Sequence, residues 1–254
     1  MGATPDVVFE VSYQLNSRGD APRNDIASLA CAQDGGADRT LFVGFENSEL
    51  QRVQLPPCNP GQVDLPIDAS FRTSFNFHNG NLIEALAISG DSLLSLSSNG
   101  KAGLLNIASP APSSSVPHMI DLDTRAWSVL LSTSASAPFV AFGTSSDTLL
   151  TIHVITPTSI SATLTMVLRA SQHQDKSALE RPTAVYGIAT APPASPWGAS
   201  DQIIVSGWFK GLVCVHDMRA SPAPTLTFAD PWSFEPIYTV AATYVDHHAF
   251  EIAF

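Results

Sequence analysis

Short runs in which apolar residues alternate with small or polar residues recur along the chain. Five units share one order: a first run, a polar gap, and a second run that ends in small residues. Alternation with a period of two is typical of β-strands that bury one face. The units cover about 26–55, 83–107, 126–155, 184–219 and 237–254.

Glycines recur at one place in this pattern. Gly44, Gly143 and Gly207 end the first part of the second run in three units. We expect a sharp turn between the second and third strands there, because glycine relieves the steric cost of such turns. Helical patterning is nearly absent, and 166–182 is the exception, which either a helix or a polar insert would explain.

The segment Val205–Arg219, with the sequence VSGWFKGLVCVHDMR, resembles the second half of a WD-repeat. Gly207 and Asp217 agree with that pattern, whereas His216 stands where tryptophan is usual and Lys210 replaces the hairpin aspartate. The Gly-His pair that precedes the first strand in this family is missing from every unit. The resemblance therefore implies a propeller in which the family's hydrogen-bonded tetrad is complete in no unit.

A four-stranded unit cannot bury both faces alone, so such units stack radially and share a core. The sequence predicts an all-β, WD40-like β-propeller formed by a single domain over 1–254. The last unit stops after a second run, which indicates four blades plus part of a fifth. Because an unclosed ring leaves strand edges open, we expect the isolated chain to be marginally soluble or to need a partner.

The stretch 217–242 is similar to the propeller region of fungal F-box/WD-repeat proteins, although no F-box helical segment is visible in the chain. Such proteins are substrate adaptors of cullin-RING ubiquitin ligases. His216–Arg219 also resembles the Trp-Asp-x-Arg motif of other cullin-ligase substrate receptors, which implies that Arg219 contacts a ligase component. The alternative is that Asp217 and Arg219 only fix the end of a strand.

The chain has 254 residues, of which 44% are hydrophobic and 14% charged, with 12 Lys plus Arg against 23 Asp plus Glu and a net charge of -11. Disorder requires low hydrophobicity and dense charge, and nucleic-acid binding requires clustered cations, so both are disfavoured. The N-terminus has no secretory signal, no apolar run is long enough for a bilayer, and the 3 cysteines are widely spaced. We expect a cytoplasmic or nuclear protein with free thiols.

Motifs for catalysis are absent from the sequence, including a Gly-x-Ser-x-Gly elbow and a P-loop. Asp246, His247 and His248 form the densest group of potential metal ligands, but adjacent strand residues point to opposite faces, so a polar loop explains them better. We therefore expect no enzyme, cofactor or metal. Two alternatives stay open: a propeller hydrolase that uses converging carboxylates or histidines with shifted pKa values, and a truncated product without independent activity.

The leading hypothesis is a non-enzymatic scaffold that binds other proteins, with basic peptides favoured by the acidic charge and cullin-ligase components implied by the resemblance. Exposed aromatic residues would anchor such contacts. Trp208, directly after Gly207, and Trp232, in a Pro-flanked loop, are the surface candidates, together with Arg219. We expect core positions for Trp127 and Tyr186, and hydrogen-bonded structural roles for the two histidines of the apolar runs, His153 and His216.

Overall fold

The structure is a computed structural model that describes most of the chain. The described residues are 13–14, 25–33, 39–55, 65–66, 72–108, 116–133, 137–145, 148–163, 166–170, 184–191, 202–209, 211–229, 235–246 and 249–253.

Two four-stranded antiparallel sheets come first along the chain. The strands of the first sheet, in order, are β2 (Ile26–Gln33), β3 (Arg39–Phe45), β4 (Leu50–Leu55) and β6 (Arg72–Phe75). The strands of the second sheet are β7 (Ile83–Ser89), β8 (Ser92–Ser97), β9 (Lys101–Asn106) and β10 (His118–Asp121). A short parallel pair joins β1 (Tyr13–Gln14) to β5 (Leu65–Pro66).

Two further antiparallel sheets follow. The strands of the third are β11 (Ala126–Ser132), β12 (Phe139–Thr144) and β13 (Leu150–Thr156), with both β14 (Ser159–Ile160) and β15 (Met166–Leu168) paired to β13. The strands of the fourth are β16 (Val185–Thr190), β17 (Ile203–Trp208), β18 (Leu212–Asp217) and β19 (Leu226–Ala229). A hairpin of β20 (Ala241–Asp246) and β21 (Ala249–Ala253) comes last.

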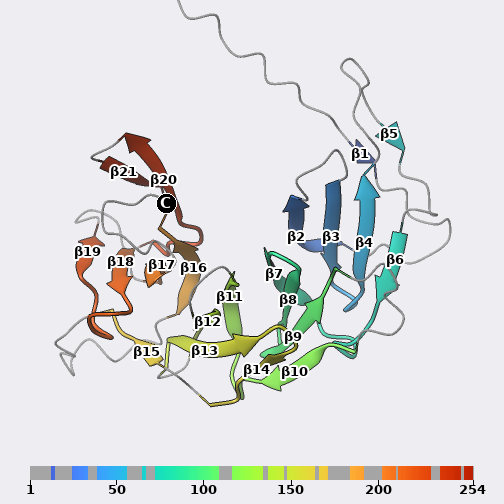
Figure 1. The fold of residues 1–254 in the computed structure, drawn as a ribbon, viewed down its shortest axis with the longest axis horizontal. Helices are drawn as coiled ribbons and strands as arrows, with labels where there is room; N and C mark the ends of the chain where they lie inside the picture. Colours follow the sequence, from blue (N-terminus) through green and yellow to red (C-terminus); the bar gives the residue numbers. More distant parts are fainter. Residues whose placement is uncertain are drawn as a thin grey trace, which may run out of the picture.

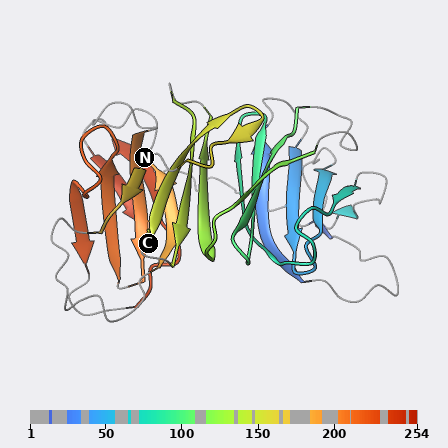
Figure 2. The same ribbon diagram turned by 90° about the horizontal axis from the view of Figure 1, so that it is seen from below.

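The sheets follow one another along an open arc, with their first strands toward its inside (Figure 1). β2 contacts β7, β7 contacts β11, and β11 contacts β16, so the first strands form a continuous inner row. β20 contacts β16 and extends the arc beyond the fourth sheet. In Figure 2 the sheets stand side by side, with their strands running alongside one another. The predicted all-β fold of stacked sheets is confirmed.

The described residues contain no α-helix, and Met166–Leu168 forms a strand where the pattern also allowed a helix. The rest of that insert, 171–183, lies outside the described residues. In the part of the chain that the structure describes, no helical segment has the length and apolar character needed to cross a membrane.

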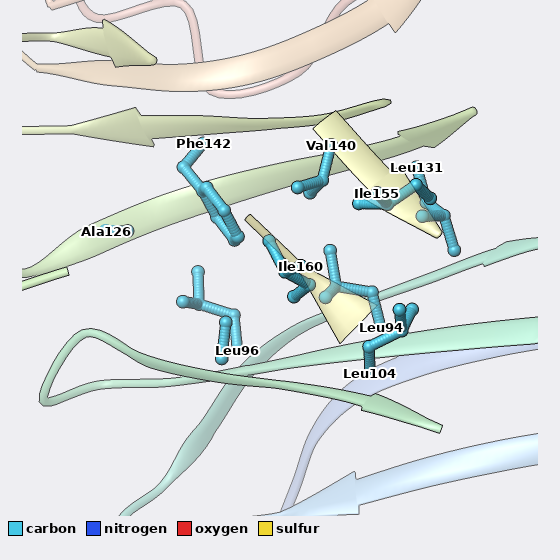
Figure 3. Close-up of a cluster of buried hydrophobic side chains, with 10 residues drawn as sticks. Leu94, Leu96, Leu104, Ala126, Leu131, Val140, Phe142, Ile155 and Ile160 are labelled. Carbon is cyan, nitrogen blue, oxygen red and sulfur yellow. The ribbon is translucent and has the colours of Figure 1, made fainter. Parts of the chain in front are cut away.

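Apolar side chains fill the space between consecutive sheets. Leu94 and Leu96 of the second sheet share one buried cluster with Val140 and Phe142 of the third (Figure 3). Each such side chain, when fully buried, contributes about 2 kcal/mol to the free energy of folding. Ile160 of β14 joins this cluster, which places the β13–β14 hairpin against the neighbouring sheet. The stacking that the repeat predicts is therefore driven by burial of the alternating apolar positions.

Each of the four inner strands has a β-bulge at its second residue. The extra residues are Ala27, Glu84, Trp127 and Tyr186. A bulge bends the strand and redirects the side chain of the extra residue. The same local distortion therefore occurs at the same end of every inner strand, and this detail was not predicted from the sequence.

Gly44, Gly143 and Gly207 lie inside β3, β12 and β17, so the prediction that they form turns is wrong. A Cβ atom on Gly44 would come within 2.5 Å of Ser28 Oγ and 2.7 Å of Ile83 Cγ2. Ile83 is the first residue of the next sheet, and such distances are well inside van der Waals contact. Glycine is required there because two sheets approach closely, not because the chain turns.

A hydrogen bond occupies the space beside two of these glycines. Ser28 Oγ donates to the carbonyl of Ile83 over 2.9 Å, and Ser128 Oγ donates to the carbonyl of Val185 over 3.1 Å. Each bond joins the inner strand of one sheet to the first residue of the next. In the second sheet Leu96 takes the place of the glycine and Ala85 takes the place of the serine, so this pair has no hydroxyl group. The junctions therefore differ: glycine and a serine hydroxyl are present after the first and third sheets, whereas a buried leucine side chain is present after the second.

Replacing Gly44 with alanine tests this close approach. We expect Gly44→Ala to lower the free energy of unfolding by about 2–3 kcal/mol, because the added methyl group must push the first two sheets apart. Urea unfolding followed by circular dichroism would measure the change. Ser28→Ala is the matched control and removes only the hydrogen bond, so we expect it to cost about 1 kcal/mol. Equal stability of Gly44→Ala and the wild type would contradict the close approach.

Candidate functional site

The bulges bring a row of large side chains to one end of the inner strands. Glu84, Trp127 and Tyr186 are bulge residues of three consecutive sheets. Tyr238 continues the series, because the preceding Ile237 lies against Gly207 as Ile83 lies against Gly44. We call this set of residues the rim row; it consists of Glu84, Arg125, Trp127, Tyr186 and Tyr238.

Aromatic rings in the rim row contact one another from sheet to sheet. The centroids of Trp127 and Tyr186 are 5.3 Å apart in an edge-to-face arrangement, and those of Tyr186 and Tyr238 are 5.0 Å apart. Phe209 lies beside Tyr186 at 6.3 Å. Tyr238 is 68% exposed, while Trp127 and Tyr186 are half-buried. The rings therefore form a continuous apolar surface that is open to solvent at one end.

Charged groups lie at the other end of the rim row. The guanidinium carbon of Arg125 is 3.7 Å from the centroid of the Trp127 ring, and Nη2 of Arg125 is 3.2 Å from Oε2 of Glu84. Burial raises the pKa of Tyr186, the neighbouring Tyr238 raises it further, and the positive charge of Arg125 partly offsets both effects. A carboxylate, a guanidinium and three aromatic rings are thus arranged in sequence along one rim.

Trp208 is not on the surface: it is 1% exposed, so its prediction as a surface candidate is wrong. Its indole Nε1 donates a hydrogen bond to Ser206 Oγ over 2.9 Å, and the ring packs in the cluster between the third and fourth sheets. Ser206 in turn donates to the carbonyl of Cys214 over 3.3 Å. Burial of the indole ring in this apolar cluster is compatible with its polar N–H group, because Ser206 Oγ accepts the hydrogen bond.

In the second sheet a histidine, which was not predicted from the sequence, is hydrogen-bonded to the equivalent buried serine. His78 is buried, and its Nε2 lies 2.9 Å from Ser95 Oγ, which donates to the carbonyl of Gly103 over 3.3 Å. Ser95 and Ser206 hold equivalent register positions, opposite Leu86 and Ile188. His78 therefore lies beside a buried serine as Trp208 does in the fourth sheet, and a histidine five residues before Ile83 was the available signal.

His153 and His216 were both predicted to be hydrogen-bonded structural residues. His153 is buried, with Nδ1 3.0 Å from the carbonyl oxygen of Ser161, as predicted. His216 is fully buried, but neither ring nitrogen has a hydrogen-bond partner of good geometry among the described residues. Burial lowers the pKa of His216 to about 4, and the nearby backbone of Pro222 only partly offsets this. The buried position is that expected of a structural histidine, and the predicted hydrogen bond of His216 stays a prediction.

Arg219 is exposed and forms a fork with Asp217. Nε and Nη2 of Arg219 lie 2.8 Å and 2.7 Å from the two carboxylate oxygens, and the backbone N–H of Arg219 donates to the same carboxylate over 3.0 Å. These bonds hold the pKa of Asp217 below its usual value. Both residues line a pocket of about 230 Å³ together with Ile203, Val215 and Thr225. The geometry is that expected of a side chain that fixes the end of β18.

The remaining candidates are Trp232 and the group of potential metal ligands near the end of the chain. Trp232, His247 and His248 lie outside the described residues. Within the described ranges, no three histidine, cysteine, aspartate or glutamate side chains are close enough to hold a metal ion. Cys214 is a buried free thiol whose pKa is raised by burial to about 12, so it is not an activated nucleophile. The converging groups that would indicate a hydrolase are not found in this part of the chain.

No protein-family model and no curated protein matches the sequence. Among solved structures, the chain is similar to the β-propeller domain of Myceliophteria thermophila Cps50 (Swd1), with a TM-score of 0.60 and 15% identity, covering 88% of this chain and 62% of that one. It is also similar to Chaetomium thermophilum Sqt1 bound to the N-terminus of the ribosomal protein L10, with a TM-score of 0.55 and 15% identity, covering 80% and 48%.

These similarities establish the fold. The WD40-like β-propeller predicted from the repeat and from Val205–Arg219 is confirmed. The chain spans less than two thirds of the length of either structure, at 62% and 48%.

Two of the buried histidines, His78 and His216, predict a dependence of stability on pH. Burial lowers the pKa of His78 and of His216 to about 4, from 6.5 in an unfolded chain. Between these values the unfolded state binds more protons, so stability is full above about pH 6.5 and falls as the pH drops toward 4. The free energy of unfolding falls by an amount on the order of 3 kcal/mol for each histidine.

Urea unfolding between pH 7.5 and pH 4.5 would measure this loss. The variant His216→Leu has no titrating group at this position and leaves no polar atom unpaired, so we expect a smaller loss of stability on acidification than in the wild type. The same pH dependence in both proteins would contradict the assignment of this effect to His216.

Proposed function

We propose that this protein is a non-enzymatic interaction scaffold that holds a segment of a partner protein along the rim row. The single observation that carries the proposal is the continuous series of Trp127, Tyr186 and Tyr238 across three consecutive units. Trp127 and Tyr186 lie in inner strands of packed sheets, and Tyr238 lies just before β20 with its ring centroid 5.0 Å from that of Tyr186, so the rings contact one another before any partner binds. Pre-organisation of this kind reduces the entropy lost on association.

The chemistry of the rim row is that of a protein-binding surface. Binding energy at protein interfaces concentrates in tryptophan, tyrosine and arginine, and all three are present here. Tyr238 is 68% exposed, which is unusual for a ring in contact with other rings inside a fold. The rim row therefore offers exposed apolar area and hydrogen-bonding groups to the same partner segment.

Two further observations support a protein partner. The similar Sqt1 structure is described as bound to the N-terminus of a ribosomal protein, so a propeller of this kind can hold a protein terminus. The net charge of -11 favours encounters with basic segments and disfavours acidic ones.

Affinity capture from the native host tests the proposal when it is done with matched variants. We expect the amount of a partner that is captured by the wild type to fall at least about fivefold with Tyr238→Ala, because an aromatic contact at an interface contributes about 1 kcal/mol or more to the free energy of binding. Phe228→Ala is the control, since Phe228 is an exposed aromatic residue on the outer strand β19. Equal capture by both variants and the wild type would contradict a role for the rim row.

A narrower version of the proposal makes the protein a substrate-recognition adaptor of a cullin-RING ubiquitin ligase. It is supported by the resemblance of His216–Arg219 to the motif of ligase substrate receptors. In that version Arg219 contacts the ligase, and its fork with Asp217 presents the guanidinium at the surface.

Co-purification with and without Arg219 tests the adaptor version. We expect cullin-ligase components to be recovered with the wild type and with Tyr238→Ala, and to be lost with Arg219→Ala. Recovery of no ligase component with the wild type would remove the adaptor role, whereas the scaffold proposal would still be decided by the effect of Tyr238→Ala on its own partner.

A further inference from the structure

The rim row already holds a cation that belongs to the chain itself. The guanidinium of Arg125 lies over the Trp127 ring at 3.7 Å, and its Nη2 is 3.2 Å and 3.4 Å from the two carboxylate oxygens of Glu84. Glu84 and Trp127 come from the bulges of adjacent inner strands, β7 and β11. The indole face and the carboxylate thus enclose a guanidinium from two sides.

Glu84 and the arginine that it binds differ in exposure. The side chain of Glu84 is 17% exposed, whereas that of Arg125 is 45% exposed. The carboxylate is therefore held by the protein, and the arginine is the component that can leave toward solvent. An indole face together with a carboxylate binds a planar cation better than either group alone, because stacking and charge pairing act on the same guanidinium.

We propose that Glu84 and Trp127 form a binding site for an arginine or lysine side chain of a basic partner segment, and that Arg125 occupies this site in the free protein. This inference rests on the proposed function, because it names the chemistry of the partner at the same rim row. Binding replaces Arg125 by the incoming cation, so the protein's own arginine acts as a competitor. Tyr186 and Tyr238 then face the residues that flank the cation.

The neighbouring charges favour such an exchange. Asp25 and Glu46 lie at the same end of the first sheet, where the backbone N–H of Glu46 donates to the carbonyl of Asp25 over 3.1 Å. Both side chains are exposed. An incoming basic segment therefore meets carboxylates on the sheet next to Glu84, whereas Arg125, once released, moves into solvent where its charge is hydrated.

The sign of one mutational effect separates this proposal from simple charge attraction. Removal of the competitor in Arg125→Ala vacates the site, and we expect a fluorescein-labelled tetra-arginine peptide to bind about threefold to tenfold more tightly. Glu84→Gln removes one side of the site, and we expect binding to weaken by a similar factor. Fluorescence anisotropy at low salt measures both, and circular dichroism confirms that each variant is folded.

Two control variants match these changes in charge. Lys101→Ala also removes one exposed cation from an ion pair on the second sheet, there with Asp121. Asp91→Asn neutralises an exposed carboxylate in the turn at the opposite end of β7 from Glu84. We expect both controls to change the affinity by a smaller factor than Arg125→Ala and Glu84→Gln, because neither Lys101 nor Asp91 takes part in the contacts of Arg125 with Trp127 and Glu84.

The outcomes for this site and for the rim row are distinguishable. Equal tightening by Arg125→Ala and Lys101→Ala, or no effect of Glu84→Gln, would overturn the cation site, and the scaffold proposal would still stand on partner capture with Tyr238→Ala. Absence of tetra-arginine binding to Arg125→Ala at low salt would also overturn it. Tight tetra-arginine binding, with partner capture unchanged by Tyr238→Ala, would support the cation site and remove the wider rim row.

Discussion

The close approach between a sheet and the start of the next unit, at three of the junctions, is the constraint on which the rest of the structure depends. Gly44, Gly143 and Gly207 leave no room for even a methyl group at three of these junctions. Where the neighbouring inner strand has Ser28 or Ser128, the hydroxyl binds the carbonyl of the next sheet. Close packing at the inner end fixes the angle between sheets, and the apolar clusters farther out fill the space that this angle leaves.

Buried polar positions show how freely the chemistry varies within that geometry. At equivalent places in the second and fourth sheets, Ser95 Oγ is hydrogen-bonded to His78 Nε2, and Ser206 Oγ accepts a hydrogen bond from Trp208. In the third sheet Phe142 takes this place, opposite Val129, and packs edge-on against His153. Both buried hydroxyls are hydrogen-bonded, but the ring that bonds them comes from a loop in one sheet and from the same strand in the other. Repeat motifs defined by residue identity therefore fail here, although the positions persist.

The bulges connect this architecture to function. They direct Glu84, Trp127 and Tyr186 to one rim of the inner strands. A fold of this kind serves many functions, so these side chains, and not the propeller itself, indicate a binding surface. The same rim provides aromatic area at one end and a charge pair at the other, which suits an extended partner with a basic residue.

The sequence alone determined the strands, because alternation of apolar positions is a local property that is visible in each run. It also determined the stacking of repeated units and the absence of clustered cations. It could not place Trp208 or the glycines correctly, because burial of an indole and the distance between two sheets depend on residues about 30 or more positions away, such as Ile237 for Gly207. The rim row was likewise decided only by the tertiary structure: Glu84, Trp127, Tyr186 and Tyr238 form no motif in the sequence. The repeated bulge at the first three residues and the stacking of the units bring them together.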